Sequence, residues 1–205
     1  MKFNPDITKQ AIEVIFSSVY NKGNHPPLEF NGIPVARHSE TKHIGVIMDE
    51  RLTFRKHINE QIEKAKKGIS LMKYLSKWVT SKILDLTYKM YVRPHLEYGD
   101  IIFHDQLSNM MEALERIQYQ AGLIVSKCWK GTNREKLYAQ LGWESLSNRR
   151  IFRRFCLYYK IKNGLSPNYL IDHLNSVPSE GRSSRFNKSF LPFCASNWDS
   201  LDEAG

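Results

Sequence analysis

The sequence has few cysteines and no long apolar run. Cys128, Cys156 and Cys194 lie far apart and form no CxxC pair, so neither a structural zinc site nor a disulfide framework is expected. No apolar stretch approaches the roughly 18–20 residues of a membrane-spanning helix. The first ten residues contain no apolar signal-peptide core. We therefore expect an intracellular protein of the cytoplasm or nucleus that is not secreted.

The motifs of several enzyme classes are also missing. The sequence contains no GxxxxGK[ST], GxGxxG, HExxH or GxSxG motif, and its seven histidines show no metal-ligand spacing. No pair of adjacent aspartates follows an apolar strand, as a two-metal polymerase site requires. Asp49 and Glu50 come closest, but they stand just before a predicted helix, where an acid stabilises the helix start. We therefore predict no catalytic or metal-binding residue and interpret Asp49 as a turn or cap residue.

What remains is a basic sequence with enough apolar residues to fold. The 205 residues are 41% hydrophobic and 12% aromatic, which is typical of a chain with a packed core. Lysine and arginine number 30 against 21 aspartates and glutamates, giving a net charge of +9. This excess suits a polyanionic partner, nucleic acid first and an acidic membrane surface second.

The pattern of apolar residues predicts an α+β fold that is mostly α. Alternation over 11–18, the Asn31-Gly32 hairpin signal and the apolar run 44–48 predict a small antiparallel β unit over 1–54. Steps of three and four residues then predict helices over 55–75, 81–91, 109–127, 133–141, 147–162 and after Ser166-Pro167. Pro94 is expected to end or kink the second helix. The helical bundle spans 55–175, and 176–205 is expected to be a flexible linker with a short docked tail.

Two basic stretches could contact phosphates. The lysine face comprises Lys64, Lys66, Lys67, Lys73 and Lys77, and by itself it is better explained as a solvated helix surface. The arginine cluster comprises Arg149, Arg150, Arg153 and Arg154, which share one face of a helix. Guanidinium groups match phosphate geometry, but arginine stems packed over the core with solvated heads are an equal alternative.

Two further groups of residues have a structural and a functional interpretation. The aromatic side chains of Trp78, Trp129, Trp143 and Tyr119 could stack on bases, although core packing is the default. The segment VRPHLEYGD, residues 92–100, could form a polar site. Arginine–carboxylate pairs that fix a helix connection are the favoured interpretation of that segment.

Five segments in this order resemble the reverse transcriptases of non-LTR (LINE-type) retrotransposons, downstream of their catalytic aspartates. KHIGVIMDERLTFRKHI (42–58) is similar to the family pattern YLGVxLDxxLxFxxHI, and YKMYVRPHLEYGD (88–100) to YxxxVRPxLxYG. FNPDITKQAIEVIFS (3–17), LERIQYQAGLIV (114–125) and the segment 134–170 resemble the regions that precede and follow them. The resemblance covers about residues 3–201, with Ile7 where the family usually has a lysine.

The resemblance implies a palm remnant over 1–54 that leads into a thumb and further helices. Gly45, Val46, Asp49, Leu52, Phe54 and His57 would form a primer-grip-like junction. The lysine face and the arginine cluster would hold an RNA–DNA hybrid or duplex without sequence preference. The palm and fingers of a parent polymerase would be a second partner, and no membrane partner is implied.

The resemblance also implies a fragment without polymerase activity. The aspartates that hold Mg²⁺ in the family would lie upstream of this sequence, so no cofactor is expected in the chain itself. The family's endonuclease domain is absent as well. The alternative functions are a helical protein-interaction domain and an inert relic that binds no nucleic acid.

Overall fold

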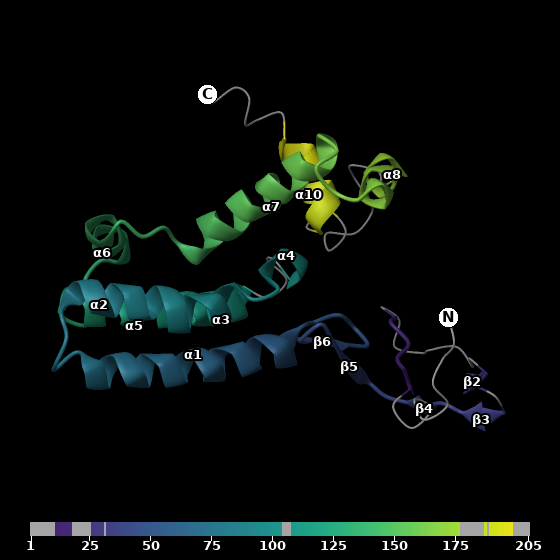
Figure 1. The fold of residues 1–205 in the computed structure, drawn as a ribbon, viewed down its shortest axis with the longest axis horizontal. Helices are drawn as coiled ribbons and strands as arrows, with labels where there is room; N and C mark the ends of the chain where they lie inside the picture. The colour runs from purple at the N-terminus through teal and green to yellow at the C-terminus, as the bar shows by residue number, and fades with distance from the viewer. Residues whose placement is uncertain are drawn as a thin grey trace. The chain divides into compact units, whose positions relative to one another are not determined.

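The structure, a computed structural model, describes residues 11–17, 26–30, 32–103, 108–176, 187 and 189–198. Short strands come first in the chain and helices follow (Figure 1), which confirms an α+β fold that is mostly α. Backbone contacts divide the chain into unit 1, Met1–Ile58, and unit 2, Asn59–Gly205. Ile7 and residues 177–186 of the predicted linker lie outside the described residues.

The described residues of unit 1 form three pairs of short strands. The strands are β1 (Ile12–Glu13), β2 (Glu29–Phe30), β3 (Ile33–Pro34), β4 (Ala36–Arg37), β5 (Glu40–His43) and β6 (Val46–Asp49). β2 and β3 pair antiparallel, with Phe30 opposite Ile33, which confirms the hairpin predicted at Asn31-Gly32. β1 and β4 pair in parallel, so the expectation of a purely antiparallel unit is wrong.

The strand predicted over 44–48 begins two residues later. Ile44 and Gly45 form the turn between β5 and β6, with φ angles of 45° and 78°. Positive φ at both central positions is what a type I′ hairpin turn requires. The apolar run did not reveal this turn because the partner strand β5, Glu-Thr-Lys-His, carries no alternating apolar pattern.

The helices follow the predicted stripes closely. They are α1 (Arg55–Leu75), α2 (Ser81–Thr87), η2 (Tyr88–Val92), α3 (Arg93–Glu97), α4 (Asp100–Phe103), α5 (Ser108–Ser126), α6 (Arg134–Leu141), α7 (Leu146–Lys162), α8 (Asn168–Ser176) and α10 (Phe190–Asn197). Five members of the α1 stripe are buried: Ile58, Ile62, Ala65, Ile69 and Met72. Both ends of α6 match their sequence signals, because Asn133 caps its start and Gly142, at φ 62°, ends it.

Of the two outcomes expected at Pro94, an end or a kink of the second helix, the end does not occur. The π-helical turn η2 precedes α3, and Pro94 occupies the first turn of α3. Proline has no backbone N–H and its ring clashes with the preceding turn of a regular α-helix. A wider turn just before the proline lets the chain continue in a helical path to Glu97.

Two glycines allow close helix packing in unit 2. A Cβ on Gly68 of α1 would lie 2.7 Å from Cγ2 of Val92 and 3.3 Å from the carbonyl oxygen of Tyr91. A Cβ on Gly122 of α5 would lie 3.0 Å from Cδ2 of Leu137 in α6. The pairs α1–η2 and α5–α6 therefore depend on the absence of a side chain at these positions.

Helix α7 is the element that most others of unit 2 contact. It packs against α3, α4, α5, α8 and α10, and Figure 1 shows α10 beside its C-terminal half. The ring of Trp198, just after α10, lies 5.0 Å from the ring of Tyr158. The ring of Phe193 lies 6.1 Å from that of Phe155. The described residues near the C-terminus thus include a helix, α10, that packs on α7.

Candidate nucleic-acid interface

Asp49 organises the turn between β6 and α1. Its carboxylate accepts hydrogen bonds from the backbone N–H groups of Arg51 (3.0 Å), Thr53 (3.0 Å) and Phe54 (3.0 Å). It also accepts one from the Thr53 hydroxyl at 2.8 Å. Partial burial alone would raise the pKa of Asp49, but these bonds outweigh it and the pKa is lowered. The interpretation of Asp49 as a turn residue is confirmed.

The other residues of the primer-grip-like junction surround this turn. Leu52 and Phe54 have positive φ angles of 51° and 55°, a conformation that side chains other than glycine rarely adopt. The Asp49 bonds hold the backbone in this shape. Val46, Phe54 and His57 are buried, and Gly45 lies in the hairpin turn. Their role near a primer end stays a prediction.

The lysine face lies on the exposed surface of α1, outside its buried stripe, and continues just beyond its end. All five lysines are exposed. Lys64 pairs with Glu60 at 3.8 Å and Lys66 with Glu63 at 2.7 Å, both on the helix surface. Lys67, Lys73 and Lys77 form no ion pair with any described residue. The face therefore keeps at least three positive charges in contact with solvent.

The arginine cluster is engaged within the fold. Its members share one face of α7, as predicted, and that face meets α3, α4 and α10. Nε of Arg149 lies 2.5 Å from Oε1 of Glu97, and Nη1 of Arg153 lies 2.9 Å from Oε2 of the same residue. Arg153 also pairs with Asp100. Neither a solvated face nor a free phosphate-binding face describes these two arginines.

The other two members of the cluster are buried. Arg154 is 0% exposed, and its guanidinium lies 4.4 Å from the centre of the Phe193 ring in α10. Arg150 is 2% exposed and faces a pocket beside α5. A buried guanidinium cannot grip a duplex from outside without rearrangement of the helices that cover it.

The carboxylates of VRPHLEYGD were expected to form arginine pairs, and they do. Glu97 and Asp100 pair with arginines of α7, more than 50 residues away, rather than with neighbouring Arg93. Burial raises the pKa of Asp100 to about 6, because its effect outweighs the opposing charges of Arg153 and Arg150. This network fastens α7 to the α3–α4 connection.

The four aromatic residues divide between core and surface. Trp143 is buried, stacks on Tyr88 with ring centres 4.0 Å apart, and donates from Nε1 to Asp85 at 2.8 Å. The Tyr119 hydroxyl donates to the carbonyl of Thr132. Trp78 is 76% exposed and Trp129 is 90% exposed, so core packing, the default expectation, is wrong for these two. Trp78 directly follows Lys77 at the end of the lysine face.

Glu115 is a structural residue that the sequence did not single out. Its carboxylate accepts hydrogen bonds from the Tyr138 hydroxyl (2.8 Å) and the Leu146 backbone N–H (3.0 Å). It thereby joins α5 to α6 and to the start of α7. In the sequence, Glu115 stands next to the apolar stripe of α5. Such a position does not distinguish a buried glutamate from an exposed one.

The described residues also limit what other chemistry the chain contains. Within those residues, no three histidine, cysteine, aspartate or glutamate side chains gather where they could hold a metal ion. The Asp49 carboxylate accepts the backbone hydrogen bonds of its own turn, and none of these bonds involves a second carboxylate. The same part of the chain includes no helix with the length and apolarity needed to cross a membrane.

The sequence is similar to part of a transposon polymerase. Over 107 residues, 50% of this chain, it is 26% identical to the probable RNA-directed DNA polymerase from transposon X-element of Drosophila melanogaster. The matched stretch is 12% of that protein's length. No protein-family model and no solved structure matches the chain. The similarity supports an origin related to reverse transcriptases.

Proposed function

We propose that this chain is part of a non-LTR (LINE-type) retrotransposon reverse transcriptase and holds a template–primer duplex without reading its sequence. In this proposal unit 1 is the end of the palm with a primer-grip-like junction, and α1 begins the thumb. In this proposal the chain contributes duplex binding, and none of its residues is assigned to catalysis. The similarity to a transposon RNA-directed DNA polymerase supports the assignment.

The observation that carries the binding proposal is the lysine face. Its residues span α1 from Lys64 to Lys73 and reach Lys77 beyond it, on the side away from the core. Three of them have no acidic partner among the described residues, so their charge is available to phosphates. Lysine ammonium groups contact phosphates without reading bases, and each neutralised phosphate releases counterions. Such a surface suits binding that depends on salt and not on sequence.

The arginine cluster is assigned a supporting role in this proposal. Arg149 and Arg153 form ion pairs with Glu97 and Asp100, and Arg154 is covered by α10. Replacing these arginines would disturb the packing of α7, so a loss of nucleic-acid binding in such variants would have two explanations. The lysines can be changed without touching the core, which makes them the better test.

The test is fluorescence anisotropy of a labelled RNA–DNA hybrid, titrated with the chain at several salt concentrations. The variant replaces Lys67, Lys73 and Lys77 by glutamine. The matched control replaces Lys130, Lys136 and Lys160, which are also exposed and have no ion pair with a described residue. We expect the variant to flatten the slope of log K against log[salt] by up to about 2.7, since each phosphate contact contributes about 0.9. The control should bind nearly as tightly as the original chain.

Three outcomes would contradict the proposal. Equal losses in the variant and the control would mean that net charge alone, and not the lysine face, drives binding. Absence of binding at low salt, from a chain whose circular dichroism shows folded helices, would remove duplex binding altogether. Binding that differs strongly between unrelated hybrid sequences would contradict the absence of sequence readout.

A protein-docking function is the second candidate, and one observation favours it. Ile83, Leu86 and Met90, on α2 and η2, are 48%, 55% and 59% exposed. Their spacing places them along one side of this helical stretch, where a parent polymerase or another protein could cover them. Sedimentation velocity distinguishes the two candidates, because self-association through an apolar face rises with concentration and depends little on salt.

A further inference from the structure

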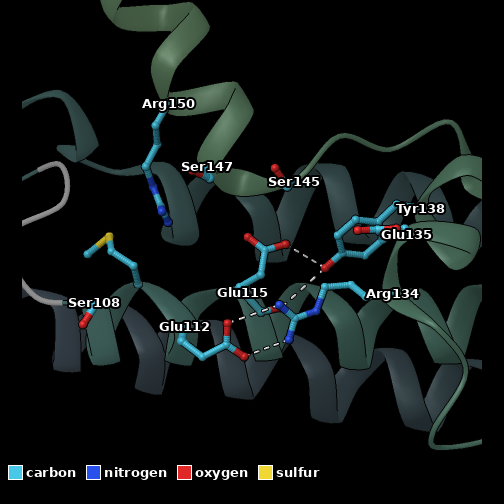
Figure 2. A pocket seen from close by; sticks show the side chains of 10 residues that line it. Ser108, Glu112, Glu115, Arg134, Glu135, Tyr138, Ser145, Ser147 and Arg150 are labelled. Atoms are coloured by element: carbon cyan, nitrogen blue, oxygen red, sulfur yellow. Dashed lines mark hydrogen bonds and ion pairs between the residues drawn. The ribbon is translucent and has the colours of Figure 1, made fainter.

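A pocket of about 410 Å³ lies between α5, α6 and the start of α7 in unit 2. Figure 2 shows Arg150 extending from α7 toward α5, on the side of Ser108, while Glu135 lies beside Tyr138 at the other end of the view. Ser147, in the first turn of α7, lines the pocket as well. The pocket thus has a cationic end at Arg150 and an acidic end at Glu135.

Two of the three guanidinium nitrogens of Arg150 have no hydrogen-bond acceptor among the described residues. Its Nε and Nη2 atoms are buried and unpartnered, and the residue is 2% exposed. Asp100 and Glu115 are close enough to favour its charge, yet neither accepts a hydrogen bond from it. Buried donors in proteins are nearly always satisfied, so an acceptor that enters the pocket would complete this site.

The two carboxylates nearest the centre of the pocket are already occupied. Glu112 binds Arg134 through two hydrogen bonds of 2.8 and 3.2 Å. Glu115 accepts from Tyr138 and from the backbone of Leu146. Figure 2 shows the bonds between Glu112 and Arg134 and between Glu115 and Tyr138. Glu112 is thus paired with a cation, whereas Glu115 is held by neutral donors and lies close enough to favour the charge of Arg150. What Arg150 lacks is an acceptor for its buried Nε and Nη2 atoms among the described residues.

The start of α7 adds further donors on the same side. Ser145 caps the helix, and its hydroxyl accepts from the Asn148 backbone N–H at 3.1 Å. The Leu146 N–H already donates to Glu115 and the Asn148 N–H to Ser145, so the Ser147 N–H is the first-turn donor without an acceptor among the described residues. The helix dipole favours an anion at this end. Ser147 contributes a hydroxyl at the pocket wall. A tetrahedral anion could accept from the guanidinium and from these groups together.

We propose that this pocket binds a phosphate group, held by the Arg150 guanidinium and the first turn of α7. Glu135, at the other end, has no ion pair with a described residue, and its carboxylate favours a phosphate ester whose organic part donates hydrogen bonds, such as a sugar hydroxyl. A mononucleotide and the 5′-phosphate of a nucleic-acid strand share this chemistry. The site goes beyond the proposed duplex binding, because its residues lie outside the lysine face.

The test is isothermal titration of the chain with inorganic phosphate, adenosine 5′-monophosphate and adenosine, in a buffer free of phosphate. We expect saturable 1:1 binding of both phosphates with a Kd of about 1 mM or tighter, and no binding of adenosine. Ser147→Asp places a negative charge in the pocket and should weaken both phosphates by at least about tenfold. An acid in the first turn of a helix favours folding, so this variant should remain folded.

Two companion variants make the result specific. Arg150→Met removes the guanidinium but keeps an unbranched stem, and it should lose phosphate binding. Lys136→Met removes an exposed charge on α6 outside the pocket and should bind as the original chain does. Unchanged phosphate affinity in folded Ser147→Asp, or no saturable binding by the original chain, would overturn the proposal.

A final comparison identifies the source of the phosphate. The comparison uses one strand with either a 5′-phosphate or a 5′-hydroxyl. If the 5′-phosphate strand binds more tightly to the original chain, but not to Ser147→Asp, the ligand is a strand end. Equal binding of the two strands with retained mononucleotide binding would identify a free small phosphate. The Ser147→Asp variant should still bind an RNA–DNA hybrid through the lysine face, so failure of one proposal is distinguishable from failure of the other.

Discussion

The lysine face of α1 and the arginine cluster of α7 are both basic runs on amphipathic helices, but the fold uses them differently. The lysines lie on the surface, and their pairs with Glu60 and Glu63 are exposed. The arginines point into the fold, where Glu97 keeps 12% and Asp100 4% of its side-chain surface exposed. One run is available to a partner, whereas most of the other connects helices of the same unit.

The difference shows that charge density alone does not locate a binding surface. Lysine is a strongly hydrated point charge on a flexible stem, whereas arginine offers a planar fork that suits partly buried carboxylate pairs. Exposed pairs of the lysine type contribute little to stability, while breaking a buried pair leaves an uncompensated charge. Changes in the arginine cluster should therefore mainly affect stability, whereas changes in the lysine face should mainly affect ligand binding.

The largest expected effect comes from removing Glu97. Glu97→Gln takes away the shared carboxylate of Arg149 and Arg153 and leaves two half-buried guanidinium groups less well paired. We expect the free energy of unfolding to fall by about 2–3 kcal/mol, measured by urea denaturation. The matched change Glu63→Gln, at an exposed pair with Lys66, should cost less than about 0.5 kcal/mol. Equal effects of the two changes would mean that the arginine cluster is no more structural than the lysine face.

A smaller effect should appear as a pH dependence at Asp100. Its pKa of about 6 in the folded chain exceeds the value of about 3.9 for an unfolded aspartate. The folded state therefore takes up the proton first, and this group's contribution to stability is fully present below the unfolded pKa and is lost as pH rises through about 6. Acidification from pH 7 to 5 should raise stability by about 1 kcal/mol through Asp100.

The control for this prediction is Asp100→Asn, which cannot titrate at this position. Urea denaturation of both proteins at pH 7, 6 and 5 gives the difference between their free energies of unfolding. The contributions of the other carboxylates cancel in this difference. The free energy of unfolding of the original chain should rise relative to that of the variant as the pH falls. A difference that stays constant, or one that changes in the opposite direction, would contradict the raised pKa of Asp100.

The smallest effect is expected where the lysine face is neutralised. Replacing Lys67, Lys73 and Lys77 by glutamine should change the free energy of unfolding by less than about 0.5 kcal/mol per residue, because the side chains are exposed and unpaired. Thermal denaturation followed by circular dichroism measures this change. A loss of about 2 kcal/mol or more would show that these lysines stabilise the fold and are not reserved for a partner.

Much of the helical unit could be predicted from the sequence, because its helices are amphipathic and carry local start and stop signals. The stripe from Ile58 to Met72, the cap at Asn133 and the stop at Gly142 all act within a few residues of chain. The turn at Asp49 is equally local, since all its hydrogen-bond donors lie within five residues. The continuation through Pro94 was missed because a π-helical turn has no reliable sequence pattern.

The candidate sites divide in the same way. The spacing of the lysine face, opposite an apolar stripe, already predicts exposure. The spacing of Arg149, Arg150, Arg153 and Arg154 puts them on one side of a helix but does not say what covers that side. The Trp143–Asp85 bond joins residues 58 apart in the chain, and nothing near Trp78 distinguishes it from such a buried tryptophan.

The sequence by itself determined the helices, the Asp49 turn and the exposure of the lysine face, because each depends on periodicity or on bonds between near neighbours. Only the tertiary structure decided that Glu97 and Asp100 neutralise Arg149 and Arg153, since those pairs form between segments more than 50 residues apart. It likewise decided that Arg150 lies at a pocket with its buried Nε and Nη2 atoms unbonded to any described residue. Whether a charged side chain stabilises the fold or can bind a ligand depends on which element packs over it.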